Sequence, residues 1–492
     1  MVKEENLMEK IVSLCKRRGF VFPGSEIYGG LSGFFDYGHY GLALKENVKR
    51  LWWKQFVLDR EDMFGMDAAI LMRQEVWQAS GHAEGFSDPL VECEKCKHRF
   101  RADQLDSSRL NLKDPKKVQP LPARLQPDKV ILAGNDSSRS GGCPDCGGKL
   151  SEARQFNMMF KTHVGAEESD TAVSYLRPET AQGMFANFKN TVDSLHPKLP
   201  FGLAQIGKAF RNEIAPRDFL FRTREFEQME IEYFVRPPKV ASRTHVDGTQ
   251  TNAEQEEWER HFEEFRSETV KFFESVGLPK EDVHELEVPD GERAHYSKRT
   301  IDFEFDFPFG RKELSGLAYR TDFDLSAHQK NSGVPFEYLD EELKTKFIPH
   351  VIEPSFGVDR LLLAVLSSAY TEDEMNGEKR TFLKLSPKIA PVKVAVFPLL
   401  KNKPELVKKA REVYDSLRST LHATGYTIAW DDNGNIGKRY RRQDEIGSPF
   451  CITVDFDSLE KDDVTVRDRD TGKQERVQIS ELQGYLKKHG NF

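Results

Sequence analysis

Long hydrophobic runs are missing from this sequence of 492 residues. No stretch approaches the roughly eighteen apolar residues of a membrane-spanning helix, and the segment after Met1 is charged and amphipathic, unlike an apolar leader. Cysteine is also scarce, because six cysteines in a chain of this length cannot form a disulfide scaffold. These absences predict a cytoplasmic protein that does not associate with membranes.

Both common glycine-rich nucleotide-binding signatures are absent as well. The candidate phosphate loop at 434–438 is too short for G-x-x-x-x-G-K-[ST], and no G-x-G-x-x-G follows an expected strand. The net charge of −8 argues against a general nucleic-acid binder. A bound nucleotide would therefore be held by side chains on a sheet, and a polyanionic partner by local patches.

The sequence divides into segments of different character. Residues 1–90 mix helix and strand signals, 91–150 hold two Cys-x-x-Cys pairs, 151–388 alternate long strands with helices, and 390–492 alternate short strands and helices. A helical insertion is expected at about 237–300, and Pro387 and Pro391 bracket a linker. We expect an α+β main body, with an antiparallel sheet flanked by helices, and a small C-terminal α/β domain with a partly parallel sheet.

An arginine-rich hairpin lies in the third of these segments. It would place Arg211 and Arg222 across from one another, where two guanidiniums can grip a bent triphosphate through bidentate bonds. Strand alternation puts Phe226, Gln228 and Glu230 on one face, and an aromatic ring beside arginines can stack on a purine. A surface hairpin with an ordinary ladder of ion pairs is the alternative.

A second candidate segment is the strand-to-helix turn from Glu353 to Arg360, which runs into an apolar helix. An arginine at a helix start is unfavourable against the helix dipole unless an anion or an aromatic face lies close by. By itself the pattern also fits a surface arginine.

The two segments resemble motifs 2 and 3 of class II aminoacyl-tRNA synthetases. Further runs resemble glycyl-tRNA synthetases of the homodimeric type, and the resemblance extends from about residue 10 to the C-terminus. These runs are 18–30, 36–38, 79–82, 101–103, 177–183 and 320–325. One departure is Gly38-His39-Tyr40-Gly41, which stands where motif 1, a dimer-interface element, has Gly-Pro-Leu-Gly.

The resemblance implies an enzyme that activates glycine with ATP and Mg²⁺ and transfers it to tRNA(Gly). It also implies a homodimer and a side product, diadenosine tetraphosphate. The alternative is a catalytically silent relative that keeps the fold as a nucleic-acid-binding accessory protein. Such a relative would be free to lose Arg211, Arg222 or Arg360, and all three are present.

The resemblance further assigns residues to ATP. Arg211 would hold the α-phosphate, Arg222 and Arg360 the β- and γ-phosphates, and Phe226 and Arg360 would enclose adenine, with Glu213 at its amino edge. The catalytic residues would be Arg211, Arg222, Arg360 and Glu313, with Glu313 beside the phosphates and Mg²⁺. The expected ATP-binding set is Arg211, Asn212, Glu213, Phe221, Arg222, Thr223, Arg224, Glu225, Phe226, Glu313, Leu314, Gly357, Val358, Asp359 and Arg360.

Glycine would lie among acidic groups, chiefly Glu179 and Glu230, together with Ser355. Its ammonium needs carboxylates, and any larger amino acid would overlap fixed polar side chains. Glu179 alone would fit a helix cap after Pro178 equally well. The expected glycine-binding set is Arg101, Glu179, Phe226, Glu227, Gln228, Met229, Glu230, Glu353, Pro354, Ser355, Phe356 and Gly357.

Two Cys-x-x-Cys pairs predict a closed tetrahedral zinc site made by Cys93, Cys96, Cys143 and Cys146. Redox chemistry and metal-free thiols are the alternatives, and the insertion at 104–142 has no predicted fold. The C-terminal segment resembles the anticodon-binding domain of the glycyl, threonyl, prolyl and histidyl enzymes. There the basic run 437–442 would meet tRNA, with Tyr440 stacking on an unpaired base, unless it is only a solvated helix face.

Overall fold

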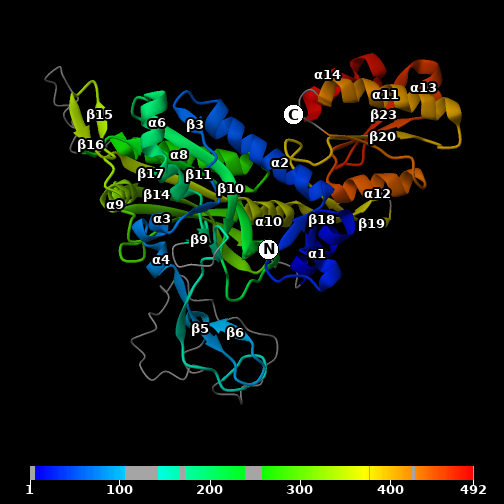
Figure 1. Cartoon of the computed structure of the whole chain (residues 1–492). Coiled ribbons are helices and arrows are strands. Elements are labelled where there is room, and N and C mark those ends of the chain that lie inside the picture. Colours follow the sequence, from blue (N-terminus) through cyan, green and yellow to red (C-terminus); the bar gives the residue numbers. More distant parts are fainter. Residues whose placement is uncertain are drawn as a thin grey trace.

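The computed structural model describes residues 6–105, 142–166, 172–238, 257–375, 377–422 and 427–490. Its helices and strands form a large main body, a small projecting lobe that contains β5 and β6, and a C-terminal body (Figure 1). Most of the insertion at 104–142 lies outside the described residues. In the described part of the chain, no helix combines the length and the apolar character needed to span a bilayer.

A seven-stranded sheet forms the centre of the main body. Its strands, in spatial order, are β12 (Val283–Glu287), β13 (Arg299–Phe307), β14 (Gly310–Thr321), β17 (His350–Gly357), β11 (Glu225–Val235), β10 (Phe201–Phe210) and β3 (Met63–Gly65). Every neighbouring pair is antiparallel except β10 and β3. The expected antiparallel sheet flanked by helices is thus confirmed.

The segment expected as a helical insertion is only partly helical. Helix α8 (Glu257–Ser275) is followed by β12, which pairs with β13 and forms the edge of the main sheet. An edge strand needs few apolar residues, because its outer edge has no neighbouring strand and faces solvent. This is why the short, charged run at 283–287 gave little strand signal.

Helices cover one face of the central sheet. They are α1 (Leu7–Arg18), α2 (His39–Trp53) with its π-helical extension (Lys54–Leu58), α8, and α10 (Val358–Ala369). Phe356 of β17 lies 6.1 Å from Trp52 and 5.6 Å from Phe272, measured between ring centroids. The side chains of Met229, Phe356 and Val358 belong to this core. Because side chains alternate along a strand, the neighbouring residues face the other side of the sheet.

The start of α2 needs its glycines. A Cβ on Gly41 would lie 1.9 Å from the carbonyl oxygen of Phe20, so no larger residue fits without moving the backbone. A Cβ on Gly38 would likewise lie 2.4 Å from the carbonyl oxygen of Gly19, which explains why both glycines of the motif 1 run are present although the two residues between them differ from the expected pair.

The remaining elements of the main body and of the projecting lobe are short. The helices are α3 (Gln74–Ala79), α4 (His82–Gly85), α5 (Ala181–Ala186), α6 (Phe188–Leu195) and α9 (Phe323–Ser332). The small sheets contain β1 (Val21–Pro23), β2 (Phe35–Tyr37), β4 (Leu71–Arg73), β5 (Ser87–Glu92), β6 (Arg99–Arg101), β7 (Arg154–Asn157), β8 (Lys161–His163), β9 (Val173–Leu176), β15 (Tyr338–Asp340), β16 (Thr345–Phe347), β18 (Tyr370–Met375) and β19 (Glu378–Leu383).

The C-terminal body has its own sheet and core. Its strands run in the order β21 (Ile428–Trp430), β20 (Val394–Pro398), β22 (Phe450–Val454), β23 (Asp463–Asp468) and β24 (Gln474–Gln478), the first three parallel and the rest antiparallel. Its helices are α11 (Pro404–His422), α12 (Ile436–Ile446), α13 (Phe456–Lys461) and α14 (Leu482–Gly490). The partly parallel α/β domain expected from the sequence is confirmed.

Candidate active site

A pocket opens on the face of the central sheet that the core helices leave free. It is built from β11, β14 and β17, from the loop that joins β10 to β11, and from the first turn of α10. The lining residues are Arg211, Glu213, Leu220, Phe221, Arg222, Thr223, Phe226, Gln228, Glu313, Leu314, Ser315, Ser355, Gly357, Asp359 and Arg360. The three arginines that the sequence singled out therefore share one cavity.

Arg211 is held in place by the backbone and by aromatic rings. Its Nε donates to the carbonyl oxygen of Pro178 at 3.0 Å. Its guanidinium carbon lies 5.2 Å from the ring centroid of Phe226 and 5.5 Å from that of Phe86. These contacts fix the side chain without neutralising it, so its charge remains available to an anion.

Arg360 approaches the pocket from the start of α10. Its guanidinium carbon lies 4.5 Å from the Phe221 ring centroid, and its Nε donates to the Phe221 carbonyl oxygen at 3.3 Å. Nη1 lies 3.4 Å from Oε2 of Glu313, whose side chain is about half exposed. An arginine in an unfavourable position at a helix start is thus stabilised by an aromatic face and one carboxylate.

Arg222 is the third arginine of the pocket. Burial lowers the pKa of its guanidinium; Glu213 opposes this shift, while Arg101, Arg217 and Arg360 add to it. Among the described residues no carboxylate forms an ion pair with Arg222. Oε2 of Glu213, in turn, is buried and has no hydrogen-bond partner in the described part of the chain. The pocket thus offers clustered cations and one buried acceptor, which suits an anionic ligand that also carries a hydrogen-bond donor.

Two carboxylates lie behind the inner end of the pocket. Oε1 of Glu230 accepts hydrogen bonds from Gln228 Nε2 and Ser355 Oγ, both at 2.7 Å, and Oε2 accepts from the backbone and hydroxyl of Thr180. Burial raises the pKa of Glu230, and the Glu179 carboxylate raises it further. Burial alone would also raise the pKa of Glu179, but His82, with Nε2 at 3.2 Å, holds it well below the usual range.

A buried arginine network next to these acids was missed as a site by the sequence analysis. Arg320 binds Asp324 through two parallel hydrogen bonds of 2.8 and 2.9 Å, and its Nη1 donates to Glu353 at 2.8 Å. Its guanidinium carbon lies 3.9 Å from the Tyr296 ring centroid. The available signal was the family-like run 320–325, which marked the segment but suggested no partner for Arg320.

Several expected site residues lie away from the pocket. Glu227 faces α2, where it pairs with Lys45 and Lys49 at 2.9 Å, and Met229, Phe356 and Val358 belong to the helix-side core. Arg224 donates to the Glu213 carbonyl oxygen rather than to the cavity. The others outside the pocket lining are Arg101, which pairs with Asp88 and Asp103; Glu225, which pairs with Lys208; and Asn212, Glu179, Glu230, Glu353 and Pro354.

The four cysteines of the two pairs form one cluster in the projecting lobe, just beyond the end of β5. Sγ of Cys93 lies 3.5 Å from that of Cys146, Sγ of Cys96 lies 3.6 Å from that of Cys143, and all four fall within 4.8 Å of one another. A tetrahedron with Zn–S bonds of about 2.3 Å has S–S edges of about 3.8 Å. A Cβ on Gly148 would lie 2.9 Å from Cys93 Sγ, so the turn requires glycine to leave room for the sulfurs. The donor set and its spacing fit a closed Zn²⁺ site.

The basic run on α12 is used differently from the prediction. Tyr440 packs against Phe397, and its hydroxyl lies 2.7 Å from Thr453 Oγ1, so its ring is inside the domain rather than presented to a base. Arg439 is buried and donates to three backbone carbonyls. The expectation that Tyr440 stacks on an unpaired base is not supported by this geometry.

Two models of known protein families match this chain. The model of the "tRNA synthetase class II core domain (G, H, P, S and T)" matches residues 160–369, and that of the "Anticodon binding domain" matches 393–489. The fold and the arginine-lined pocket therefore define a class II aminoacyl-tRNA synthetase.

Curated relatives named glycine–tRNA ligase narrow the family. Those from Bacillus anthracis and Clostridium kluyveri are each 48% identical to this chain, covering 99% of both sequences. One from Thermobifida fusca is 46% identical, covering 99% of this chain and 98% of the relative. The chain belongs to the glycine–tRNA ligase family.

Proposed function

We propose that this protein activates glycine with ATP and transfers the glycyl group to the 3′ end of tRNA(Gly). The observation that carries the proposal is the convergence of Arg211, Arg222 and Arg360 in one pocket, with Glu179 and Glu230 behind its inner end. Family membership supports the same substrates.

The first step joins glycine to the α-phosphate. A glycine carboxylate oxygen attacks the α-phosphorus in line, the bond to the bridging oxygen breaks, and pyrophosphate leaves. Arg211 stabilises the negative charge that grows on the α-phosphate, while Arg222 and Arg360 hold the departing end. In the second step a ribose hydroxyl of the terminal nucleotide attacks the glycyl carbonyl carbon, and AMP leaves. No covalent bond to the enzyme is needed.

Adenine and the metal have candidate partners in the same pocket. The buried Oε2 of Glu213 would accept a hydrogen bond from the adenine amino group, and Phe226 and Arg360 would enclose the ring; their common position in the pocket lining supports these roles. Glu313, half exposed and close to Arg360, would hold Mg²⁺ with the phosphates, and the ion would neutralise charge on the departing pyrophosphate.

We propose that the enzyme selects glycine because the amino acid is small and because the polar side chains of the inner pocket wall are fixed in place. Ser315 donates to the Ser355 carbonyl oxygen at 2.6 Å, and Ser355 is bound in turn to Glu230, so the inner wall cannot rotate away. A methyl group on the substrate would displace these hydrogen bonds, which is costlier than filling an apolar pocket.

The wider organisation follows the same proposal. We infer a catalytic domain from 1–90 and 151–388, a zinc-knuckle insertion at 91–150, and an anticodon-binding domain at 390–492. The exposed Leu42 and Leu58 near the two ends of the α2 region support a homodimer, and the scarcity of cysteine in the sequence supports a reducing, cytoplasmic setting.

The experiment that tests the function is pyrophosphate exchange with each amino acid in turn, using the purified full chain. Exchange is expected with glycine alone, because larger side chains meet the fixed serines. Exchange with serine or alanine but not glycine would overturn the substrate assignment. No exchange, together with tRNA binding, would favour the silent accessory protein.

Replacing Cys143 with serine is expected to remove one equivalent of zinc per chain and to lower the melting temperature. The neutral hydroxyl is a poor zinc ligand, and a structural zinc contributes directly to folding. Elemental analysis and thermal melting measure the two effects. Cys15→Ala, in the core away from the cluster, serves as control and should keep the metal; equal zinc in both variants would contradict the site.

A further inference from the structure

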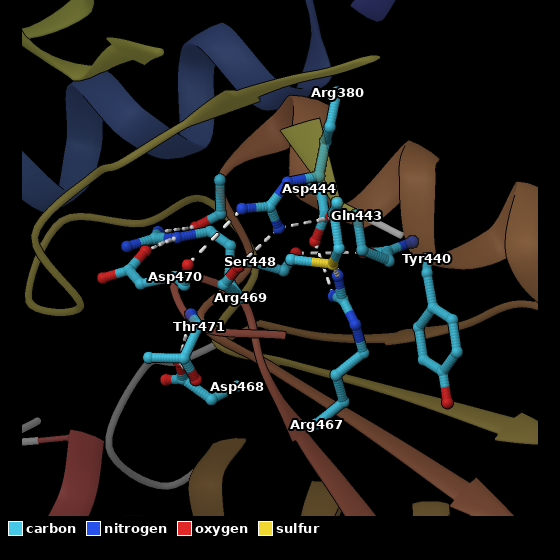
Figure 2. Close-up of polar contacts among 12 residues, drawn as sticks. Arg380, Tyr440, Gln443, Asp444, Ser448, Arg467, Asp468, Arg469, Asp470 and Thr471 are labelled. Carbon is cyan, nitrogen blue, oxygen red and sulfur yellow. Dashed lines mark hydrogen bonds and ion pairs between the residues drawn. The ribbon is translucent and has the colours of Figure 1, made fainter. Parts of the chain in front are cut away.

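A buried ion-pair network joins the main body to the C-terminal domain (Figure 2). From the main body, Arg380 of the β18–β19 hairpin reaches into the C-terminal domain, where Asp444 of α12, Arg467 of β23 and Arg469 surround it. The side chains of Arg380 and Asp444 are only 5% and 1% exposed. A network buried to this degree is organised by the fold rather than by chance surface contact.

Arg380 is the member that crosses between the domains. Its Nη1 donates to the Arg469 carbonyl oxygen at 2.6 Å and to Asp444 Oδ2 at 3.3 Å, and Nη2 donates to the Asp470 carbonyl oxygen at 3.4 Å. On its own hairpin, Arg380 is oriented by two parallel bonds to Asp373, at 2.9 and 2.6 Å. The main body thus orients the Arg380 guanidinium, and the C-terminal domain supplies the oxygen atoms that accept its hydrogen bonds.

The Asp444 carboxylate on the receiving side is paired without Arg380. Asp444 accepts two hydrogen bonds from Arg467, at 2.7 and 3.0 Å, and Arg469 donates to the Gly447 carbonyl oxygen at 2.8 Å. Removing Arg380 therefore leaves the Asp444 carboxylate paired inside its own domain. This separates the joint between the domains from the stability of the C-terminal domain.

Other contacts close the same boundary. Glu445 of α12 pairs with Arg17 and Arg18 of α1. Asn47 of α2 donates to the carbonyl oxygens of linker residues Ile389 and Ala390 at 3.1 and 3.0 Å. Domains in one chain generally move relative to one another unless such an interface restrains them.

We propose that Arg380 is a positioning residue that fixes the C-terminal domain relative to the active-site pocket, and thereby selectively supports transfer to tRNA. The proposal rests on the function proposed above. A tRNA bound at the distant C-terminal domain brings its 3′ end to the pocket only if the angle between the domains is right. Small errors in placement at a reacting centre are costly in rate. Glycine and ATP bind within the main body and do not depend on this angle.

Arg380→Ala is expected to lower kcat/KM for tRNA in aminoacylation about tenfold, while glycine-dependent pyrophosphate exchange stays within twofold of the parent. Arg380→Lys keeps the positive charge but not the planar guanidinium, so its kcat/KM for tRNA should lie between those of the parent and Arg380→Ala. Small-angle scattering of the Arg380→Ala variant should show a larger radius of gyration. The matched control is Arg299→Ala, which removes an arginine bound to Glu287 and Glu263 and stacked on Phe262, all within the main body. It should leave the kcat/KM for tRNA unchanged.

Unchanged kcat/KM for tRNA in Arg380→Ala would overturn the proposal, as would an equal loss in exchange and aminoacylation. If this variant does not fold, Glu445→Gln weakens the same boundary through α1 and must show the same selective loss. A parent protein without glycine-dependent exchange would instead refute the proposed function, so the two failures are distinguishable.

Discussion

Arg211→Ala is expected to reduce glycine-dependent pyrophosphate exchange about 10³-fold. Arg211 is fixed by the Pro178 carbonyl and by two aromatic rings, and its charge has no carboxylate partner among the described residues. Such a preorganised cation acts where charge grows on the α-phosphate, and removing one donor of this kind costs about 10²–10³ in rate, with more for arginines at phosphoryl groups. Steady-state exchange with saturating glycine and ATP measures the loss.

Two further variants show whether geometry or charge alone is responsible. Arg211→Lys keeps a cation without the planar fork, so it should recover only part of the activity. Arg217→Ala removes a cation from the same loop, where Arg217 is half exposed and lies 3.5 Å from Asp218. It should retain exchange within a few-fold of the parent. A comparable loss in Arg211→Ala and Arg217→Ala would mean that general positive charge, rather than a placed guanidinium, drives the reaction.

Periodic elements could be predicted from the sequence closely. The apolar pattern at 201–210 predicts a strand, and these residues form β10; the helical spacing at 404–422 predicts a helix, and these residues form α11. Both have apolar patterns long enough to distinguish the two periods. The edge strand β12 escaped prediction because its charged residues are stabilised by pairing with β13, which no local pattern shows.

The candidate site could be predicted in part. The alternation of side chains along β11 explains which expected residues face the pocket and which do not. Phe226, Gln228 and Glu230 share one face of β11, as the period of two required, while Glu227 and Met229 were included on family pattern alone and face the helices. The Arg320–Glu353 pair and the joint at Arg380 bring together residues far apart in the sequence. Such pairs arise from the tertiary fold, so spacing along the chain could not reveal them.

Glu230→Gln is expected to lower kcat/KM for glycine about 100-fold and to leave the KM for ATP nearly unchanged. The substitution removes a negative charge behind the inner end of the pocket, and hydrogen bonds to charged groups are worth up to about 3 kcal/mol. The fold should tolerate it, because the amide oxygen can still accept from Thr180. If the Gln228 amide, whose Nε2 now faces Glu230, rotates by half a turn, its Oε1, which has no partner among the described residues, can accept from the new amide nitrogen. Exchange at varied glycine and varied ATP separates the two effects.

The matched control is Glu232→Gln, two residues further along the same face of β11. Both carboxyl oxygens of Glu232 are buried without hydrogen-bond partners among the described residues, and burial together with Glu353 raises its pKa well above the ordinary value. Because burial favours the neutral form of this carboxyl, an amide of the same shape is a close substitute, and activity should change little. A loss as large as that of Glu230→Gln would mean that shape, and not the charge at Glu230, decides glycine binding.

The pH dependence of the same variant gives the sign of the Glu230 contribution. Because burial and Glu179 raise its pKa, Glu230 takes up a proton at a higher pH than an ordinary glutamate, and kcat/KM for glycine should fall on that acid side. The contribution of Glu230 to the free energy of unfolding has the opposite pH dependence. This stabilisation is fully present below the ordinary glutamate pKa, and it is lost as the pH rises through the raised pKa of the folded state. Ionised Glu230 therefore destabilises the empty pocket, and a bound ammonium offsets that cost. In Glu230→Gln the acid-side fall should be absent; if it persists unchanged, another group titrates there.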